Sequence, residues 1–298
     1  MNGVVYDTGV LVKSNETGLI DIIAISELNS GDWMITNGDG RGYSGCPGYS
    51  VYSGTGFVKI KGIVRGKSEG NIYRLISRLG TVDITAEAKV FSSDSRPITV
   101  DYLIPKETKL FCKEINIKGH SCEITPELAY ILGVFMAKGT TTGNTSRLRL
   151  NSVSELTTAC SELSLETPEF GMSIYTESEI FHEFYTDIDP EKRVPITILN
   201  SSREIQEQFL KGLYSDSEHI DTFSKNSLTG IFYLLQRTGR HPYINNDGDI
   251  SIHSSELSES ITVSVTDITS EYYSTYIYSL ETDTGLFHGS VGNLLICN

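Results

Sequence analysis

The sequence predicts a mainly β domain that is interrupted by an α/β domain. Short runs rich in β-branched and aromatic residues fill roughly the first 115 residues, and strand patterns return from about residue 256. Between them, capped segments carry apolar residues at helical spacing. Because the last β segment is too short to fold alone, we expect residues 1–118 and 256–298 to form one split domain, with residues 119–255 inserted as a second domain.

The N-terminal part is expected to be all β. Its strand candidates are "GVLVKS", "LIDIIAI", "YSVYSG", "FVKIKGIVRG", "NIYRLISR" and "TVDITA", which Gly, Asn and Asp separate. A Gly-rich stretch, "NGDGRGYSGCPG" at residues 37–48, is not followed by a helix with Lys and Ser or Thr. We therefore interpret it as a turn and not as a phosphate-binding loop.

Two helices of similar design are expected in the inserted part. The segment "TPELAYILGVFMAKGT" begins with Thr125 as N-cap and Pro126 at the first helical position, and it ends at Gly139. About 80 residues later, Ser202 caps "REIQEQFLKGLYSDSE", which has a comparable apolar stripe. This similarity indicates an internal duplication. A further helix is expected in "SLTGIFYLLQRTGRHP".

The C-terminal part returns to strand patterns, in "ITVSVTDI" and "STYIYSLETDTGLFHGSVGNLLICN". An alternation typical of one strand face predicts core packing for four tyrosines: Tyr272, Tyr273, Tyr276 and Tyr278. The apolar run at residues 291–296 is expected to be a buried strand that holds Asn298 in a fixed place. An asparagine held in this way can attack its own backbone carbonyl through the amide nitrogen, which closes a succinimide and releases whatever follows.

Composition excludes several classes of protein. With 39% hydrophobic residues over 298 positions, disorder is not expected, and no apolar stretch is long enough to span a bilayer. No charged-then-apolar signal segment opens the chain, so we expect an intracellular protein, in the cytoplasm or nucleus of a host, with a viral gene as one option. Five cysteines without CxxC spacing support neither a disulfide framework nor a zinc site.

The charge of the chain disfavours nucleic-acid binding. The formal net charge is −14, from 24 Lys and Arg against 38 Asp and Glu. A protein that binds duplex DNA gains affinity by neutralising phosphates, and this chain has few basic clusters. The candidates for DNA contact are Arg147 with Arg149, and Arg237 with Arg240. For each pair the alternative is an ordinary solvated surface.

Taken together, these segments resemble an intein: a Hint-type, horseshoe-like protein-splicing domain interrupted by a LAGLIDADG homing endonuclease domain. For the inserted α/β domain, the resemblance implies two pseudo-symmetric halves of αββ type. The first intein block is similar to "GVVYDTGVLVKSNETGLIDIIAISEL", the second to "GTVDITAEAKVF", and the last two to "YIYSLETDTGLFHGSVGNLLICN". The two LAGLIDADG helices are similar to "LAYILGVFMAKGT" and "FLKGLYSDSE", and "KRVPITIL" before the second is also typical of that domain. The first block is closest to inteins of viral or archaeal family-B DNA polymerases.

The resemblance implies that the first splicing step has lost its nucleophile. Aligning Asp7 and Thr8 with the family's Asp-Thr pair puts Gly3 where the family has a Cys or Ser. Glycine has no side chain with which to attack the preceding peptide bond. In the second block Thr85 is kept, whereas Ala88 stands where the family has a histidine that assists the same bond.

The last two blocks are altered in the same way. Ser279 and Gly285 stand where the family usually has Asp and His, and Cys297 replaces the penultimate His. Asn298 is intact. Of the splicing positions, only Asn298 and Thr85 therefore match the family.

The endonuclease positions are also changed. In the family each LAGLIDADG helix ends in an acidic residue, and the pair binds the divalent metal ions, with Mg²⁺ expected, that activate water. The register from Gly133 puts Lys138 at the first acid, and the register from Gly212 puts Ser217 at the second, next to Asp216. Because a helix turns about 100° per residue, Asp216 would point elsewhere. The resemblance thus implies loss of DNA cleavage and of metal binding, and splicing itself uses no cofactor.

Three functions remain open at this stage. The first is an intein-like element that has lost activity, with flanking host segments (exteins), expected to be those of a DNA polymerase, as its partners. The second is C-terminal cleavage by Asn298, aided by Thr85 and Cys297, with His288 as a further candidate helper. The third is a DNA-binding module that does not cut. In each case we expect a monomer without a membrane partner.

Overall fold

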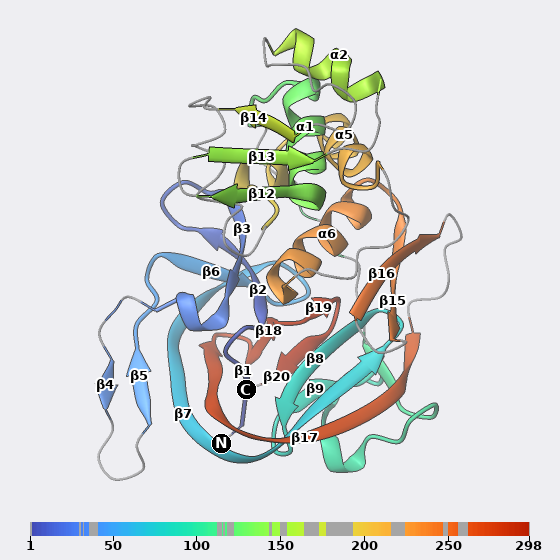
Figure 1. The fold of residues 1–298 in the computed structure, drawn as a ribbon. Helices are drawn as coiled ribbons and strands as arrows, with labels where there is room; N and C mark the ends of the chain where they lie inside the picture. The colour runs from blue at the N-terminus through green and yellow to red at the C-terminus, as the bar shows by residue number, and fades with distance from the viewer. Residues whose placement is uncertain are drawn as a thin grey trace.

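The computed structural model has most helices and a small sheet at one end and the larger sheets at the other (Figure 1). It describes residues 2–29, 31, 33–35, 41–111, 115, 117, 122–142, 145–149, 154–163, 173–176, 193–215, 224–246, 250–255 and 262–297. The helix α6 (Lys225–Arg237) lies between the two ends, next to both.

A large sheet forms the β-rich end. Within the described residues it has 11 strands, connected in the order β11-β17-β1-β8-β7-β6-β2-β3, with β4, β5 and β19 attached beside this path. The bounds are β1 (Val4–Val5), β2 (Gly9–Ser14), β3 (Ile20–Ala24), β4 (Met34–Ile35), β5 (Gly42–Ser44), β6 (Tyr49–Tyr52), β7 (Phe57–Ser77), β8 (Gly80–Thr85), β11 (Lys109–Phe111), β17 (Thr262–Thr282) and β19 (Val291–Gly292). Residues 25–27 and 100–102 form 3₁₀ turns. Strands from both ends of the sequence therefore share one sheet.

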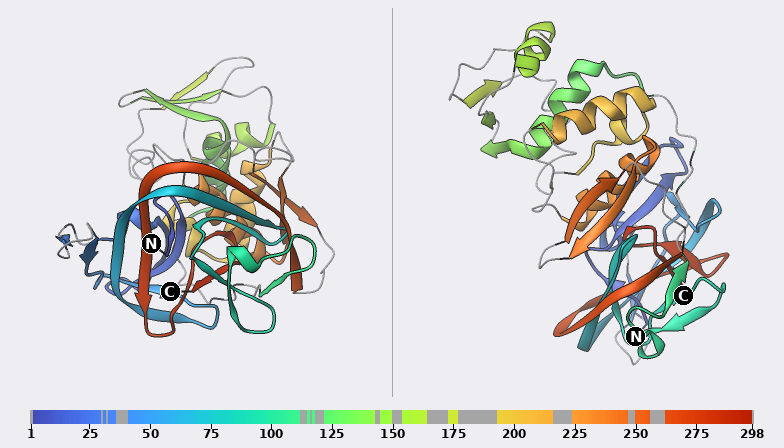
Figure 2. Two further views of the ribbon diagram at one scale, coloured as in Figure 1. Left: turned by 90° about the horizontal axis from the view of Figure 1, so that it is seen from below. Right: turned by 90° about the vertical axis from the view of Figure 1, so that its right-hand side faces the viewer.

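Two long strands differ from the prediction of shorter ones. The sequence predicts a break near "GKSEG", yet β7 continues for 21 residues and pairs with the 21-residue β17 along nearly its whole length. The break is absent because the backbone of this polar stretch is paired from Gly66 to Gly70 with β17. The ribbon of β7 and β17 curves around the segments that lead to the two chain ends (Figure 2).

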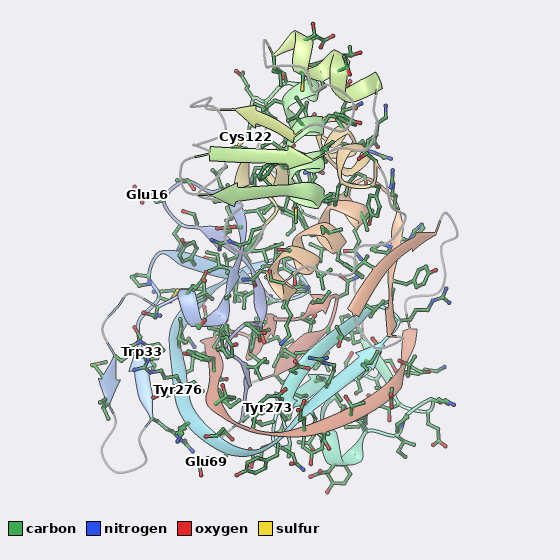
Figure 3. All side chains as sticks on the ribbon, viewed as in Figure 1. Glu16, Trp33, Glu69, Cys122, Tyr273 and Tyr276 are labelled. Carbon is green, nitrogen blue, oxygen red and sulfur yellow. The ribbon has the colours of Figure 1, made fainter. Side chains whose placement is uncertain are left out.

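The prediction that all four tyrosines of β17 pack in the core is wrong for three of them. Tyr278 is buried, but Tyr272, Tyr273 and Tyr276 are 68%, 47% and 49% exposed. The reason is that the outer part of the ribbon extends beyond the core, so its side chains face solvent (Figure 3). There the Arg65 guanidinium carbon lies 4.1 Å from the ring centre of Trp33 and 5.4 Å from that of Tyr276.

A second, four-stranded sheet contains the C-terminal strand. Its order is β10-β9-β20-β18, with β9 (Lys89–Phe91), β10 (Pro97–Thr99), β18 (Leu286–His288) and β20 (Leu295–Cys297). The expected burial near the C-terminus is confirmed, since residues 291–297 are all buried, but the expected single strand is divided into β19 of the large sheet and β20 of this one. β20 is paired on both sides, with β9 and with β18.

Both helices predicted from capping signals are present. The first is α1 (Pro126–Lys138), where the Leu128 amide donates to Thr125 Oγ1 at 3.3 Å. The second is α5 (Arg203–Leu213), where the Ile205 amide donates to Ser202 Oγ at 3.4 Å.

Helices α1 and α5 touch backbone to backbone through two glycines. A methyl group at Gly133 would lie 2.0 Å from the carbonyl oxygen of Phe209, and one at Gly212 would lie 2.0 Å from that of Tyr130. The glycine of each helix therefore contacts the backbone of the other helix, so the contact is reciprocal.

The expected αββ order holds for the first half only. After α1 come β12 (Gly139–Thr142), β13 (Thr145–Arg149), α2 (Ser154–Glu162) and β14 (Ser173–Thr176). In the second half α6 stands between α5 and the hairpin of β15 (His241–Asn246) and β16 (Ile250–Ser255). The additional helix was itself predicted, and it packs on β2, β3 and β19 of the large sheet. A short helix, α4 (Ile196–Leu199), precedes α5.

One apolar core spans the inserted and the β-rich parts. It joins residues of α1, α5 and α6 to Leu11, Ile20, Ile22 and Val291 of the β-rich part. A second cluster lies within the strands and contains Ala88. The side chain of Asn200, which is fully buried, adds polar contacts between the parts: it accepts from the Ile20 amide at 2.8 Å and donates to the Ile20 carbonyl at 2.7 Å.

Candidate functional site

Gly3 and Thr85, from the first and second intein-like blocks, lie in contact. The Gly3 amide donates to Thr85 Oγ1 at 3.3 Å, and the Thr85 amide donates to the Gly3 carbonyl at 3.1 Å. Both residues are buried. The pairing follows from β1, which lies between β8 and β17 in the large sheet. The structure thus brings together two positions that are 82 residues apart in the chain.

The backbone around Gly3 leaves no room for a side chain. A methyl group there would lie 2.3 Å from the carbonyl oxygen of Tyr278 and 2.7 Å from Cγ2 of Ile277, both on β17. Real side-chain carbons do not approach a carbonyl oxygen so closely, so β17 would have to move for any other residue. The position therefore lacks both a nucleophile and the space for one.

Ala88 and Cys297 lie at the same corner of the fold. The Ala88 amide donates to the Thr85 carbonyl at 3.0 Å, and Ala88 is fully buried in the strand core. The next residue, Lys89, pairs with Cys297 across β9 and β20. Burial raises the pKa of the Cys297 thiol to about 11, so this thiol is neutral near pH 7 and is a poor proton acceptor.

Ser279 and Gly285 are at different places on the way to β20. Ser279 is on β17 opposite Val64 of β7, and it directly follows Tyr278. Gly285 is in the turn between β17 and β18 with a φ of 68°, a conformation that favours glycine. Asn298 lies outside the described residues.

The predicted endonuclease positions are described only in part. Lys138 is the last residue of α1, and its backbone alone is described. Ser217 and Asp216 lie outside the described residues. An ammonium group cannot replace a carboxylate as a ligand for Mg²⁺, so the residue at the first acid position does not fit the metal. No group of three or more metal-ligating side chains occurs among the residues that the structure describes.

The arginines proposed for DNA contact are not gathered into one described surface. Arg237 donates to the carbonyl of Ile117 and lies near the ring of Tyr233, so its guanidinium is bound within the chain. Arg240 is exposed. Arg147 and Arg149 are two residues apart on β13 and so belong to the same face of that strand. Only their backbone is among the described parts of the structure.

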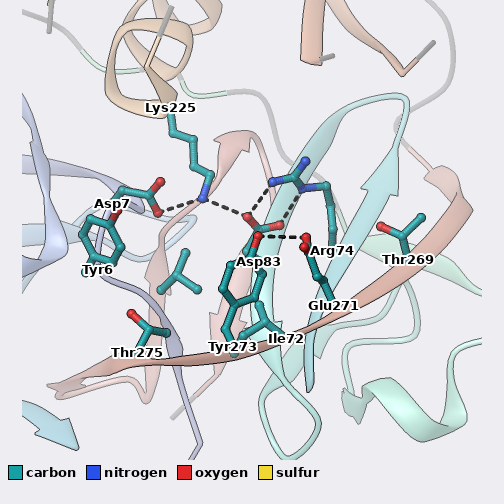
Figure 4. A pocket seen from close by; sticks show the side chains of 11 residues that line it. Tyr6, Asp7, Ile72, Arg74, Asp83, Lys225, Thr269, Glu271, Tyr273 and Thr275 are labelled. Atoms are coloured by element: carbon teal, nitrogen blue, oxygen red, sulfur yellow. Dashed lines mark hydrogen bonds and ion pairs between the residues drawn. The ribbon is translucent and has the colours of Figure 1, made fainter. Parts of the chain in front are cut away.

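The sequence does not predict an ion-pair network that includes Asp83, on the same strand as Thr85. The Lys225 ammonium lies 2.7 Å from Asp7 Oδ1 and 2.8 Å from Asp83 Oδ2, and Arg74 binds both Asp83 oxygens at 2.7 and 2.9 Å (Figure 4). These side chains line a cavity of about 320 Å³. Burial by itself would raise the pKa of Asp83, but the hydrogen bond from Arg74 and the nearby Lys225 charge outweigh it, so the pKa is lowered. The partners are up to 218 residues apart, and no local motif signals them.

His288 is a buried neutral histidine. It is 2% exposed on β18, and its Nε2 contacts the carbonyl oxygen of Gly292. Burial lowers its pKa to about 4, although the contact with the Gly292 carbonyl acts in the opposite direction. At neutral pH the ring is uncharged, and its Nε2 is engaged inside the fold.

Two solved structures of inteins are similar to this chain. The structure is similar to the transcription factor IIB Mvu mini-intein, with a TM-score of 0.44, 13% identity and 100% of both chains covered. It is also similar to the Pab PolII intein, with a TM-score of 0.40, 12% identity, and 99% of this chain and 100% of that chain covered.

One curated relative is a much longer protein. Over its whole length the chain is 25% identical to a DNA polymerase of Acanthamoeba polyphaga mimivirus, and it spans 20% of that protein's length. No family model matches. The chain is thus similar to two inteins and to one fifth of a viral DNA polymerase. In the described part of the chain, no helix is long and apolar enough to cross a membrane.

Proposed function

We propose that the chain is an intein-like element, carried within a DNA polymerase, that has lost the first step of protein splicing. The contact between Gly3 and Thr85 supports the intein-like part, because it joins the two blocks that would surround the upstream peptide bond. The alignment of the full chain with one fifth of a longer polymerase supports the host context.

The observation that carries the loss of splicing is the surroundings of Gly3. An acyl shift needs a hydroxyl or thiol that attacks the carbonyl carbon of the preceding residue. At Gly3 this group is missing, and the Tyr278 carbonyl occupies its space. A change of one residue would therefore not restore the step, since β17 would also have to move.

The second block supports the same conclusion. A histidine at position 88 would protonate the leaving amide nitrogen. Ala88 is instead fully buried among apolar side chains, where an imidazole would have to displace its neighbours. Apolar side chains thus occupy the space that a histidine at position 88 would need.

An endonuclease origin for the inserted part belongs to this proposal. The reciprocal contacts of Gly133 and Gly212 support it, because two helices that meet backbone to backbone are what paired LAGLIDADG motifs would form. With Lys138 at the first acid position, the proposed ancestral site would bind no Mg²⁺ and cut no DNA.

C-terminal cleavage is a second candidate function, which one observation favours. β20 is paired on both sides and buried, so it holds the chain rigidly up to Cys297. Asn298 would then need only its own amide nitrogen to form a succinimide. Cys297 offers little help, because burial raises its pKa and keeps its thiol neutral.

The experiment is to express the full chain between two unrelated carrier domains, with Ser after Asn298. Incubation with and without dithiothreitol, followed by intact-mass spectrometry, separates the possible steps. We expect no thiol-dependent release of the upstream carrier. Release of the downstream carrier, abolished by Asn298→Ala, would establish the second candidate, and ligated carriers would contradict the proposal.

A further inference from the structure

Lys225 connects the inserted part to the segments that carry Gly3 and Thr85. It is the first residue of α6, and its side chain is only 19% exposed. Its two partners are Asp7, in the turn after β1, and Asp83, on β8. One ammonium group thus bridges the turn after β1 and the strand β8 of the large sheet.

The two carboxylates stand next to the candidate site in the sequence. Asp7 is four residues after Gly3, and Asp83 is two residues before Thr85 and on the same strand. Asp83 is nearly buried, with 10% of its side chain exposed, so its charge depends on Arg74 and Lys225. Moving Lys225 away would leave this carboxylate with a single cationic partner among those described here.

The first two turns of α6 also contact β2 and the segment before β19. A methyl group at Gly9 would lie 2.8 Å from Thr229 Oγ1 and 2.9 Å from Asn226 Oδ1, so β2 and the helix are in close contact. Thr229 Oγ1 also lies 3.3 Å from the carbonyl oxygen of Ser290, which directly precedes β19. The helix therefore contacts the first block and the segment that leads to β20.

We propose that Lys225 is a positioning residue that couples the inserted part to the Gly3–Thr85 contact. By holding Asp7 and Asp83 together, it fixes β1 against β8 and so keeps the Gly3 amide on Thr85 Oγ1. The inserted part is then a component of the site's scaffold. This coupling is a property of the fold and holds whether or not the chain cleaves itself.

Hydrogen–deuterium exchange of the full-length chain tests the coupling directly. Peptides that cover residues 3–8 and 81–88 report on β1 and β8, and peptides from α1 and α5 report on the rest of the fold. We expect Lys225→Met to speed exchange in the first two peptides by about tenfold, with little change in α1 and α5. Lys225→Arg, which keeps the charge, is expected to restore protection.

Two further variants make the test decisive. Lys59→Met removes an exposed lysine from β7 and is expected to change neither peptide. Asp7→Asn breaks only one of the two ion pairs and is expected to speed exchange in residues 3–8 without unfolding the chain. Unchanged protection of residues 3–8 and 81–88 in Lys225→Met, or failure of Lys225→Arg to restore it, would overturn the proposal. Because the readout is exchange and not cleavage, the result is independent of the splicing assay.

Discussion

The close packing around Gly3 can be tested by measuring the stability of a variant. Gly3→Ala would place a methyl group against the Tyr278 carbonyl, and we expect it to lower the free energy of unfolding by about 1–3 kcal/mol. Urea unfolding measures this loss. Gly70→Ala on β7 is the control, since a methyl group there meets open space. An equal effect of both substitutions would argue against a filled position at Gly3.

His288 makes the stability of the fold depend on pH. Its pKa is about 4 in the folded chain and near 6.5 when exposed, so between these values the unfolded chain takes up a proton that the folded chain does not. The free energy of unfolding therefore has its full value above pH 6.5 and falls as the pH drops towards 4. This residue accounts for a loss of about 3 kcal/mol.

The measurement is the free energy of unfolding from urea titrations at pH 7 and pH 4.5, for the original chain and for His288→Gln. We expect the variant to be less stable at pH 7 and to lose less between the two values. The same loss in both chains would show that other groups cause the pH dependence.

At the scale of elements, the α1–α5 contact depends on two glycines. Gly133→Ala or Gly212→Ala would drive a methyl group into a backbone carbonyl, and we expect each to destabilise the chain by about 2 kcal/mol or more, despite the better helix propensity of alanine. Thermal unfolding followed by circular dichroism checks this, again with Gly70→Ala for comparison. A stabilised helix pair in either variant would contradict the close contact.

Local signals were sufficient for most elements, and they failed where distant contacts decide. Thr125 and Ser202 as caps correctly predicted the starts of α1 and α5. The polar stretch at residues 66–70 suggested a break because its sequence has weak strand propensity, whereas pairing with β17 keeps it extended.

The candidate site was also predictable only in part. Motif alignment put Gly3, Thr85 and Ala88 into one site, and the structure brings them together. The role of the Tyr278 carbonyl could not be predicted, because it depends on how closely β1 approaches β17. The ion pairs of Lys225 could not be predicted for a similar reason, since Asp7 and Asp83 lie on distant segments that share no sequence motif with it.

At the scale of the whole molecule, the two parts are joined by a common core. Deleting residues 119–255 and linking the ends would expose Leu11, Ile20 and Ile22, which pack against the helices. We expect the shortened chain to bind the dye ANS and to self-associate, because it leaves a contiguous apolar face in water. Size-exclusion chromatography and ANS fluorescence measure this. A monomeric product with cooperative unfolding would show that the β-rich part is independent.

We propose that this chain keeps an intein-like fold while the first chemical step of splicing is lost. The most direct measurement is the intact mass of the full chain fused between two carrier domains after incubation with dithiothreitol. We expect the upstream carrier to stay attached, because Gly3 provides no nucleophile and its neighbours leave no room for one. Appearance of the two carriers joined to each other, with the chain released, would contradict it.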